Sequence, residues 1–393
     1  MDKLKILFGV SGGISVYKAA NFVSSLVKEG HEVNVVMTEN ATKFVSPLTF
    51  EALTKNNCYT DTNLPVGKES LAHIILPQNS DVFVVCPATA NTISKIALGI
   101  ADNLLTTMAM ARNCPLVLVP AMNNVMWQNP SLQDNVKKLL SQNVIFFGPT
   151  YGRLACESTG SGRMLETHEL LEMFNYYFYP KKDFLGKKIL ITAGPTREPI
   201  DPVRYISNRS SGKMGYFLAQ IASLRGAQVK LISGPTSLDT PYMVERINVE
   251  TSEEMLRCVR ENFETCDILI MAAAVSDFKV SEQFMSKIKK KDSFEIKLTS
   301  NPDILKEISK LKKNQLVVGF AAETENLNIY AKKKLEEKGL DYIVANKIHN
   351  SGFPFGSEDN EVLILSAEGD SFELSSTKKD IANFILDLLS KKL

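Results

Sequence analysis

Short apolar runs alternate with amphipathic, helix-like runs along most of the 393 residues of this chain. Apolar runs of strand length without polar alternation are typical of strands buried on both faces, as in a parallel sheet covered by helices. Residues 14–28 form the first helix-like run, and Gly30 marks its end. The strands predicted in the first half are residues 4–10, 32–37, 81–86, 115–119 and 143–147.

The alternation begins a second time at Lys187, after an aromatic and basic stretch at residues 176–186. We place a domain boundary there, and the chain length agrees because domains usually contain about 100–200 residues. The predicted fold class is α/β, with two doubly wound, mainly parallel-sheet domains at residues 1–181 and 187–393. The strands predicted in the second half are residues 188–192, 228–232, 268–272, 316–320, 342–345 and 362–365, and a final helix is predicted over residues 378–389.

Composition and net charge indicate which kinds of ligand the chain can bind. Apolar residues make up 44% of the chain and charged residues 23%, as in a globular protein with a sizeable core. With a net charge of +1, the chain has no overall positive field that would attract nucleic acid or an anionic membrane. No apolar run reaches the roughly 18 residues that a membrane helix needs. The six cysteines form no C-x-x-C pair, and the N-terminus does not resemble a signal peptide, so we expect a cytoplasmic protein that binds small molecules.

The connection between the strand at residues 188–192 and the helix-like run at residues 213–225 is the most unusual loop. Strand-to-helix loops usually contain about 2–6 residues, and this one is far longer. Backbone N–H groups and a helix N-terminus after a strand favour anions, so we expect a phosphate site; an ordinary connection with a solvated basic surface is the alternative. Neither common nucleotide motif is present, because Met214 stands where a Walker A loop has Ser or Thr and the G-x-G-x-x-G spacing is absent. The cations of the loop are Arg197, Arg204, Arg209 and Lys213.

The loops that follow the first-half strands contain small hydroxyl and amide side chains and little charge. Ligands of open parallel sheets lie beyond the carboxyl ends of the strands, so these loops are the expected site. Their chemistry suits a neutral, planar ligand with one phosphate, and flavin mononucleotide (FMN) fits better than a dinucleotide. The alternative for each Ser, Thr or Asn is a role as a helix N-cap. The candidate flavin residues are Gly12, Gly13, Ser15, Thr38, Thr89 and Asn91.

Two residues of the first half could act chemically. His73 precedes the strand at residues 81–86, but a lone His is more often a packed or surface residue. Cys156 lies in a glycine-rich loop with Arg153 and Arg163 at its ends. Glycines permit hinge motion and a nearby arginine favours a thiolate, so one interpretation is a mobile segment with a reactive thiol. The other is an ordinary solvent-exposed loop.

The strand-end loops of the second half have the composition of a nucleotide site. Ala273 and its small neighbours allow close approach of a flat ligand, and Asp277 follows with a carboxylate suited to Mg²⁺. The lysine-rich run at residues 287–291 is either a solvated face or a triphosphate contact. Phe320 could pack on a base, and Lys334 and Lys338 lie four residues apart on one helix face.

Three motifs of the first half occur together with His73 and Cys156. They are P-A-T-A-N-T at residues 87–92, P-A-M-N-N-V-M-W at 120–127 and G-R-M at 162–164. In this order they resemble the flavin-dependent cysteine decarboxylase family, although Glu157 departs from the family pattern, in which glycine follows the cysteine. The resemblance implies that FMN oxidises a cysteinyl group to a thioaldehyde and that loss of CO₂ leaves an enethiolate. It implies that His73 and Asn123 act on the substrate and that Cys156 donates the proton in the return reduction.

The second half carries its own set of motifs. They are T-A-G-P-T-R-E-P-I-D-P-V-R at residues 192–204, S-N-R-S-S-G-K-M-G at 207–215, A-A-A-V-S-D at 272–277, K-I-K-K at 287–290, N-P-D-I at 301–304 and G-F-A-A-E-T at 319–324. With the first-half motifs, they make essentially all 393 residues resemble the family of bifunctional coenzyme A biosynthesis proteins, which join a phosphopantothenoylcysteine decarboxylase to a phosphopantothenate–cysteine ligase. The resemblance implies a flavodoxin-like flavoprotein domain followed by a Rossmann-like ligase domain. Pro195 is a small departure, because many members have glycine there.

In the implied ligase reaction, the carboxylate of 4′-phosphopantothenate attacks the α-phosphate of CTP, and cysteine then displaces cytidylate from the acyl-cytidylate. Arg204 and Asn208 match positions that act on this intermediate, and Lys287 matches the lysine needed to form it. The implied CTP site comprises Ala273, Asp277, Lys287, Pro302, Asp303, Ile304, Leu305, Phe320, Lys334 and Lys338, with Mg²⁺ at Asp277.

The implied partners are 4′-phosphopantothenate, L-cysteine and CTP, with no nucleic acid and no membrane. The resemblance also implies a homo-oligomer, with trimers of the flavin domain and dimers of the ligase domain combined in a dodecamer. Two rival classes stay open. The missing G-x-G-x-x-G disfavours a nicotinamide dehydrogenase, and the presence of His73, Asn123 and Cys156 disfavours a noncatalytic flavin-binding regulator.

Overall fold

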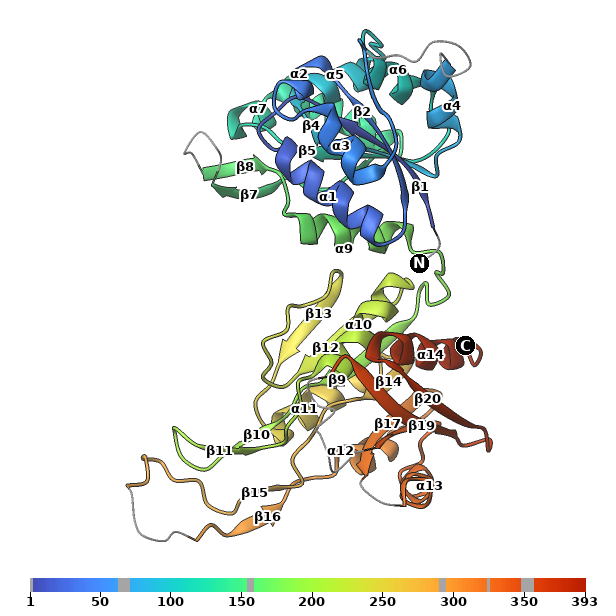
Figure 1. The fold of residues 1–393 in the computed structure, drawn as a ribbon. Helices are drawn as coiled ribbons and strands as arrows, with labels where there is room; N and C mark the ends of the chain where they lie inside the picture. The colour runs from blue at the N-terminus through green and yellow to red at the C-terminus, as the bar shows by residue number, and fades with distance from the viewer. Residues whose placement is uncertain (1–2, 63–70, 154–158, 290–294, 324–325, 348–356) are drawn as a thin grey trace. The chain divides into compact units, whose positions relative to one another are not determined.

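The computed structural model describes residues 3–62, 71–153, 159–289, 295–323, 326–347 and 357–393. The chain divides into two compact units, Met1–Pro180 and Lys181–Leu393, which we call the N-terminal and C-terminal units. Each unit is built on its own sheet, with helices packed against it (Figure 1). The predicted α/β fold with two sheet domains is confirmed.

The N-terminal unit contains a six-stranded parallel sheet in the order β3-β2-β1-β4-β5-β6. The chain builds outward from β1 through β2 and β3, then returns to the other side of β1 for β4, β5 and β6. Doubly wound sheets bind ligands where the order reverses, here at the carboxyl ends of β1 and β4. The strands are β1 (Lys5–Val10), β2 (Glu32–Met37), β3 (Cys58–Thr60), β4 (Val82–Ala88), β5 (Leu116–Pro120) and β6 (Ile145–Phe146).

Strand β4 shows why the sequence favours this sheet. Val82 and Val84 pack in one core cluster, whereas Phe83 and Val85 pack in the cluster on the opposite face. Every residue of β4 is buried, so the run has no polar alternation. The helices of this unit are α1 (Val16–Lys28), α2 (Glu39–Thr42), α3 (Pro47–Thr54), α4 (Ala72–Gln78), α5 (Ala90–Leu98), α6 (Leu104–Ala111), α7 (Asn124–Gln128), α8 (Pro130–Ser141) and α9 (Thr167–Phe178).

The C-terminal unit contains an eight-stranded sheet in the order β13-β12-β9-β14-β17-β18-β19-β20. It is parallel from β13 to β18, and β19 and β20 are antiparallel, so the prediction of a mainly parallel sheet is confirmed. The order reverses between β9 and β14. The strands are β9 (Lys188–Ala193), β12 (Gln228–Ser233), β13 (Val244–Asn248), β14 (Ile268–Met271), β17 (Leu316–Glu323), β18 (Tyr342–Lys347), β19 (Asp359–Ser366) and β20 (Ser371–Thr377).

The long connection after β9 contains an antiparallel hairpin, β10 (Arg197–Pro199) and β11 (Tyr205–Ser207). A second short pair, β15 (Phe278–Val280) and β16 (Leu298–Ser300), lies beside β10, and both pairs extend away from the main sheet of this unit (Figure 1). Sequence analysis did not predict these strands, because runs of three partly exposed residues give no apolar pattern. In the N-terminal unit, β7 (Thr150–Arg153) and β8 (Thr159–Arg163) form a similar pair.

The helices of the C-terminal unit are α10 (Lys213–Leu224), α11 (Ser252–Phe263), α12 (Ile304–Ser309), α13 (Leu327–Glu337) and α14 (Lys378–Ser390). Helix α10 packs directly on the end of β9, since a Cβ added to Gly215 would lie 2.5 Å from the Cβ of Ala193. None of the helices in the described ranges is long and apolar enough to cross a membrane.

Candidate active sites

A cavity of about 880 Å³ lies at the carboxyl ends of β9, β14 and β17. It is lined by residues from the loop before α10, the loop after β14, the start of α12, the end of β17 and helix α13. The structure brings these segments together although the first of them, the loop before α10, and the last, helix α13, are more than 100 residues apart in the sequence. The expected site residues that line the cavity are Asn208, Ala273, Asp277, Pro302, Asp303, Ile304, Leu305, Phe320, Lys334 and Lys338.

Hydrogen bonds from the β9 side fix the loop after β14. The hydroxyl of Thr192 accepts from the N–H of Ala273 at 3.2 Å, and that of Thr196 accepts from the N–H of Ser276 at 2.9 Å. The side-chain nitrogen of Asn208 donates to the carbonyls of Ala274 and Val275, at 3.3 and 3.0 Å. The Asn208 amide therefore ties the loop before α10 to the loop after β14, and its oxygen is the group that it can offer a ligand.

The cavity has basic groups toward two of its walls. On the α13 side, the ammonium of Lys338 lies 3.1 Å from the carboxylate of Asp303, which also caps α12 by accepting from the N–H of Lys306 at 3.1 Å. On the α10 side, Lys213 pairs with Glu358, and this pairing lowers the pKa of the Glu358 carboxyl. Lys378 also lines the cavity and is only 5% exposed, and burial lowers its pKa.

Sequence reasoning missed Lys378 and its neighbours in the cavity wall, Asn346 and Asn360, which hydrogen-bond each other at 3.3 Å. No motif marked them, and only the fold brings them beside Lys213. Arg204 and Lys287 were expected at the site but do not line the cavity in the described part of the chain. Arg204 instead contacts Asp201 and the backbone of Ile288.

The N-terminal unit gathers most of the expected flavin residues at the carboxyl ends of β1, β2 and β4. The hydroxyl of Ser11 donates to the carbonyl of Pro87 at 2.7 Å and accepts from the N–H of Thr89 at 3.0 Å, which ties the β1 loop to the β4 loop. A Cβ added to Gly12 would lie 2.6 Å from the Cβ of Asn40, so the β1 loop also touches the first turn of α2, which follows β2. Gly13 is open, since its added Cβ would meet only a methyl of Thr89 at 3.9 Å.

Several of these residues are also helix N-caps. Thr38 caps α2 by accepting from the N–H of Ala41 at 3.3 Å, and Thr89 caps α5 by accepting from the N–H of Thr92 at 3.4 Å. Ser15 precedes α1 without a side-chain cap bond, and Asn91 is exposed in the first turn of α5. The helix-cap interpretation is thus correct for the two threonines, and it is compatible with ligand binding at the same edge.

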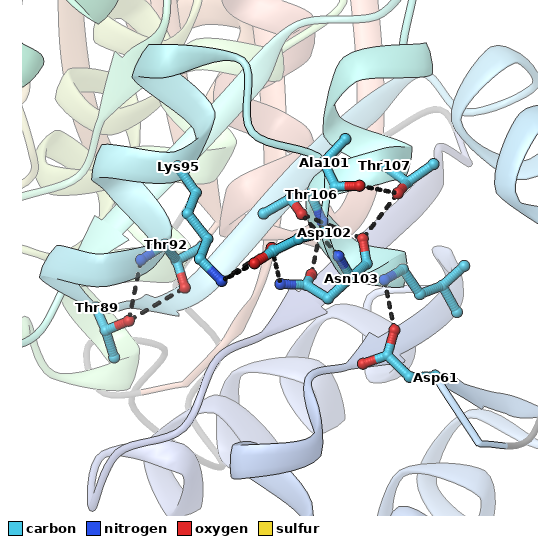
Figure 2. Close-up of polar contacts among 10 residues, drawn as sticks. Asp61, Thr89, Thr92, Lys95, Ala101, Asp102, Asn103, Thr106 and Thr107 are labelled. Carbon is cyan, nitrogen blue, oxygen red and sulfur yellow. Dashed lines mark hydrogen bonds and ion pairs between the residues drawn. The ribbon is translucent and has the colours of Figure 1, made fainter.

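Figure 2 shows a polar network that connects α5 with α6. Lys95 of α5 lies 2.7 Å from the carboxylate of Asp102, and hydrogen bonds from this lysine lower the pKa of Asp102. Asn103 caps α6 and accepts from the N–H of Thr106 at 3.0 Å, while Asp61 accepts from the N–H of Leu104 at 2.6 Å. This network, which the sequence motifs did not reveal, holds the C-terminal end of the helix that begins at the candidate flavin site.

Two of the three expected catalytic residues of this unit, His73 and Asn123, lie in the described part of the chain and on different elements. His73 is half-buried in α4, and Asn123 caps α7 by accepting from the N–H of Val125 at 2.8 Å. Cys156 and Glu157 lie outside the described residues. The β8 strand beyond them is held against the Asn123 loop, because the N–H of Met122 donates to the carbonyl of Gly162 at 2.9 Å.

Comparison with known proteins covers both units. Residues 1–176 match the Flavoprotein family, and residues 184–393 match the DNA/pantothenate metabolism flavoprotein C-terminal domain. The coenzyme A biosynthesis bifunctional protein CoaBC of Bacillus subtilis (strain 168) is 43% identical over 391 residues, which cover 98% of this chain and 96% of that protein. The protein of the same name from Borreliella burgdorferi is 44% identical over 394 residues, covering 99% and 100% of the two chains. A crystal structure of the C-terminal domain of a CoaBC protein is 41% identical and covers 54% of this chain and 98% of that one, with a TM-score of 0.47.

These matches confirm the prediction of a bifunctional enzyme of coenzyme A biosynthesis with decarboxylase and ligase activities. Both halves of the chain are matched by their own family, in the order that the motifs indicated. The chain belongs to the family of bifunctional coenzyme A biosynthesis proteins.

Proposed function

We propose that residues 1–181 form an FMN-dependent phosphopantothenoylcysteine decarboxylase and that residues 187–393 form a CTP-dependent phosphopantothenate–cysteine ligase. The observation that carries the ligase assignment is the cavity of about 880 Å³, because residues expected for a nucleotide meet there from four separate segments. The product of the ligase is the substrate of the decarboxylase, so the two activities follow each other.

The residues at the carboxyl ends of β1, β2 and β4 fit FMN. Helices α1, α2 and α5 begin at this edge, and helix N-termini favour a phosphate. The open space over Gly13 leaves room for a flat ring system, and the neighbouring side chains are neutral hydrogen-bonding groups. When bound, the flavin accepts two electrons from the cysteinyl substrate and later returns them. The residues that would hold it are Gly12, Gly13, Ser15, Thr38, Thr89 and Asn91.

His73 and Asn123 would orient the cysteinyl substrate, and Cys156 would donate a proton to the decarboxylated carbon. A thiol suits this step because its pKa of about 8.5 makes it a usable acid near neutral pH. The anchoring of β8 to the Asn123 loop supports the assignment, since β8 begins three residues after Cys156 in the sequence and contacts the loop that carries Asn123.

In the ligase, the nucleotide would occupy the side of the cavity lined by Pro302–Leu305, Phe320 and the α13 lysines. Asp277 is exposed at the cavity and can bind Mg²⁺, because Mg²⁺ commonly uses one or two carboxylates together with substrate phosphates. The N-terminus of α10 would take the phosphate of 4′-phosphopantothenate. Activation by CTP is required because a carboxylate is not an electrophile.

Asn208 would act in the second half-reaction. Its amide nitrogen donates hydrogen bonds to two backbone carbonyls, which leaves the amide oxygen for a ligand. This oxygen can accept a hydrogen bond from the amine of cysteine as that amine attacks. Lys287 would instead stabilise the charge that develops on the α-phosphate as the acyl-cytidylate forms.

We further propose a cytoplasmic homo-oligomer with flavin-domain trimers and ligase-domain dimers, combined in a dodecamer. Exposed apolar side chains on the β10–β11 and β15–β16 pairs, including Val203, Tyr205 and Phe278, favour an interface there, since lone protomers rarely expose such clusters. Native mass spectrometry of the full chain tests this. A stable monomer with both activities would contradict it.

The direct test of the proposed function uses purified full-length protein. Flavin absorbance bands and release of FMN on denaturation should identify the cofactor. With 4′-phosphopantothenate and cysteine, CTP should support product formation at lower concentration than ATP, and omission of Mg²⁺ should stop the reaction. A protein without flavin that uses both nucleotides equally would refute the cofactor and CTP assignments.

A further inference from the structure

Asp201 is a buried carboxylate in the turn between β10 and β11. Its side chain is 0% exposed, and one oxygen accepts from the N–H groups of Val203 and Arg204, at 2.8 and 2.9 Å. The N–H of Ile200 also donates to the carbonyl of Arg204 at 2.8 Å. These bonds close the turn, and alone they would make Asp201 an ordinary turn residue.

The second oxygen of Asp201 reaches a segment that is distant in sequence. It accepts from the N–H of Ile288 at 3.1 Å and from the guanidinium of Arg204 at 3.1 Å. The same guanidinium donates to the carbonyl of Ile288 at 3.3 Å. Asp201 and Arg204 thus hold the backbone of Ile288 by both its N–H and its carbonyl, and we call these three residues the Ile288 clamp.

The Ile288 clamp fixes the backbone immediately after Lys287. A second contact, from the N–H of Phe284 to the carbonyl of Ile200 at 2.9 Å, fixes the same segment three residues before Lys287. Lys287 itself is exposed between these two anchors. A long lysine side chain covers a wide volume, and anchoring its backbone on both sides limits where its ammonium can reach.

We propose that Asp201 is a positioning residue of the ligase, which holds the Lys287 segment so that the ammonium can reach the α-phosphate of the nucleotide. The inference rests on the proposed ligase function and adds a residue to it. Both oxygens of Asp201 are occupied by donors of the chain itself, so it acts through Lys287 and not on the substrate.

The chemistry of the Ile288 clamp requires a carboxylate. All four groups that face Asp201 are donors, and only an acceptor at both oxygens satisfies them. An asparagine could keep the two bonds of the turn with its oxygen, but its NH₂ group would then face the N–H of Ile288 and the guanidinium. Burial opposes ionisation of Asp201, but the N–H groups of Ile288, Val203 and Arg204 outweigh it and lower the pKa of this carboxyl.

The test is Asp201→Asn in the full chain, followed by its separate half-reactions. In a mixture of CTP, Mg²⁺ and 4′-phosphopantothenate without cysteine, the rate of acyl-cytidylate formation should fall by about 10- to 100-fold, as expected when a catalytic group is misplaced by about 1 Å. Cysteine attack on pre-formed acyl-cytidylate should be slowed much less, because Asn208 makes no contact with Asp201 and Arg204 keeps its main-chain bond in the turn. Decarboxylation of supplied phosphopantothenoylcysteine should also be unchanged, because it occurs in the other unit.

Glu198→Gln is the matched control. Glu198 is another buried carboxylate of the same hairpin, 2% exposed, but it accepts from the N–H of Ser252 at 3.0 Å and is outside the Ile288 clamp. Its variant should keep both half-reactions near wild type. Ile288→Pro removes the donor from the other side and should reproduce the selective loss if Asp201→Asn fails to fold.

The outcomes separate the two proposals. If the wild-type protein forms no acyl-cytidylate, the ligase mechanism is wrong. If wild type forms it and both Asp201→Asn and Ile288→Pro form it equally fast, Asp201 does not position Lys287. Equal losses in both half-reactions would show that Asp201 only supports the fold of the hairpin, and would also overturn the inference.

Discussion

The two candidate sites occupy equivalent places in two similar sheets but are built from different kinds of groups. At the flavin site the expected side chains are neutral, and Thr38, Thr89 and Asn123 are fixed by local cap bonds. At the nucleotide site the charged side chains are held by one another, as Lys338 is by Asp303 and Lys213 is by Glu358.

This difference predicts different responses to ligand. A cap bond lies within one turn of the chain and survives when a ligand binds beside it. A partly exposed ion pair is weak, and a phosphate can replace the carboxylate partner. We therefore expect the flavin site to keep its hydrogen bonds on binding and the nucleotide site to exchange its ion pairs, and the predictions below test this contrast.

The largest expected effect is at the nucleotide site. Lys287→Gln should abolish detectable acyl-cytidylate, because an amide cannot stabilise the developing phosphate charge. Asn208→Asp should still release pyrophosphate from CTP but hold the acyl-cytidylate, since its added charge opposes cysteine attack and also faces the carbonyls of Ala274 and Val275. Mass analysis of a quenched mixture checks both variants. Acyl-cytidylate with Lys287→Gln but not with Asn208→Asp would reverse the assignment.

The second prediction concerns the decarboxylase. Cys156→Ser should allow oxidation and CO₂ loss but stall before the return reduction, because a hydroxyl is a much poorer acid than a thiol. An oxidised product should accumulate in mass spectra, whereas His73→Asn should block the first oxidation. Ligase turnover is the internal control and should be unchanged in both variants. Normal product at the wild-type rate from Cys156→Ser would remove the cysteine from the mechanism.

Sequence patterns predicted most strands of the two sheets, because strands such as β4 and β9 are largely buried on both faces and mainly apolar. The edge strands β3 and β13 were missed, because β3 has only three residues and β13 is partly exposed. The patterns also did not predict β20, in which exposed and half-buried residues alternate, or the three-residue strands of the β10–β11 pair. Short edge elements are specified by tertiary pairing more than by their own sequences.

The same limit applies to the sites. Residues next to strand ends, such as Ala273 and Thr89, could be named from the sequence because parallel sheets place ligands there. Lys378 and Asp201 could not, since Lys378 reaches the cavity from α14 and Asp201 contacts a segment 87 residues away in the chain. Contacts of this kind follow from topology, which no local motif encodes.

The third prediction uses acid to separate the units. In the N-terminal unit, burial lowers the pKa of His31, which is 4% exposed, so the unfolded state binds the proton more readily. This unit should lose stability as the pH falls below about 6.5. In the C-terminal unit, burial alone would raise the pKa of Asp183, but hydrogen bonds from Arg225 and Lys181 lower it to about 2. Its contribution is fully present above about pH 4 and is lost as the pH falls toward 2.

The expected loss from Asp183 is about 1–2 kcal/mol, moderated because the side chain is a quarter exposed. Hydrogen exchange measured by peptide at several pH values, after correction for intrinsic exchange, should show the N-terminal unit opening first. Asp183→Asn should remove the acid step of the C-terminal unit alone. Constant protection of β1 and β2 between pH 7 and 5 would contradict the role of His31.

The smallest expected effect is that of a single cap at the flavin site. Thr89→Ala removes the hydroxyl that accepts from the N–H of Thr92 at 3.4 Å and contacts the hydroxyl of Ser11 at 3.4 Å, so it should destabilise the N-terminal unit by about 0.5–1 kcal/mol. Thr89 also lies at the sheet edge where FMN would bind, so the flavin content after dialysis should fall as well. Thr377→Ala is the matched control, since Thr377 caps α14 in the other unit by accepting from the N–H of Asp380 at 3.1 Å. Thr377→Ala should destabilise the C-terminal unit by a similar free energy and leave the flavin content unchanged. If Thr89→Ala lowers stability but keeps its flavin, Thr89 is a cap only, and the flavin must be held by the other loops at this edge of the sheet.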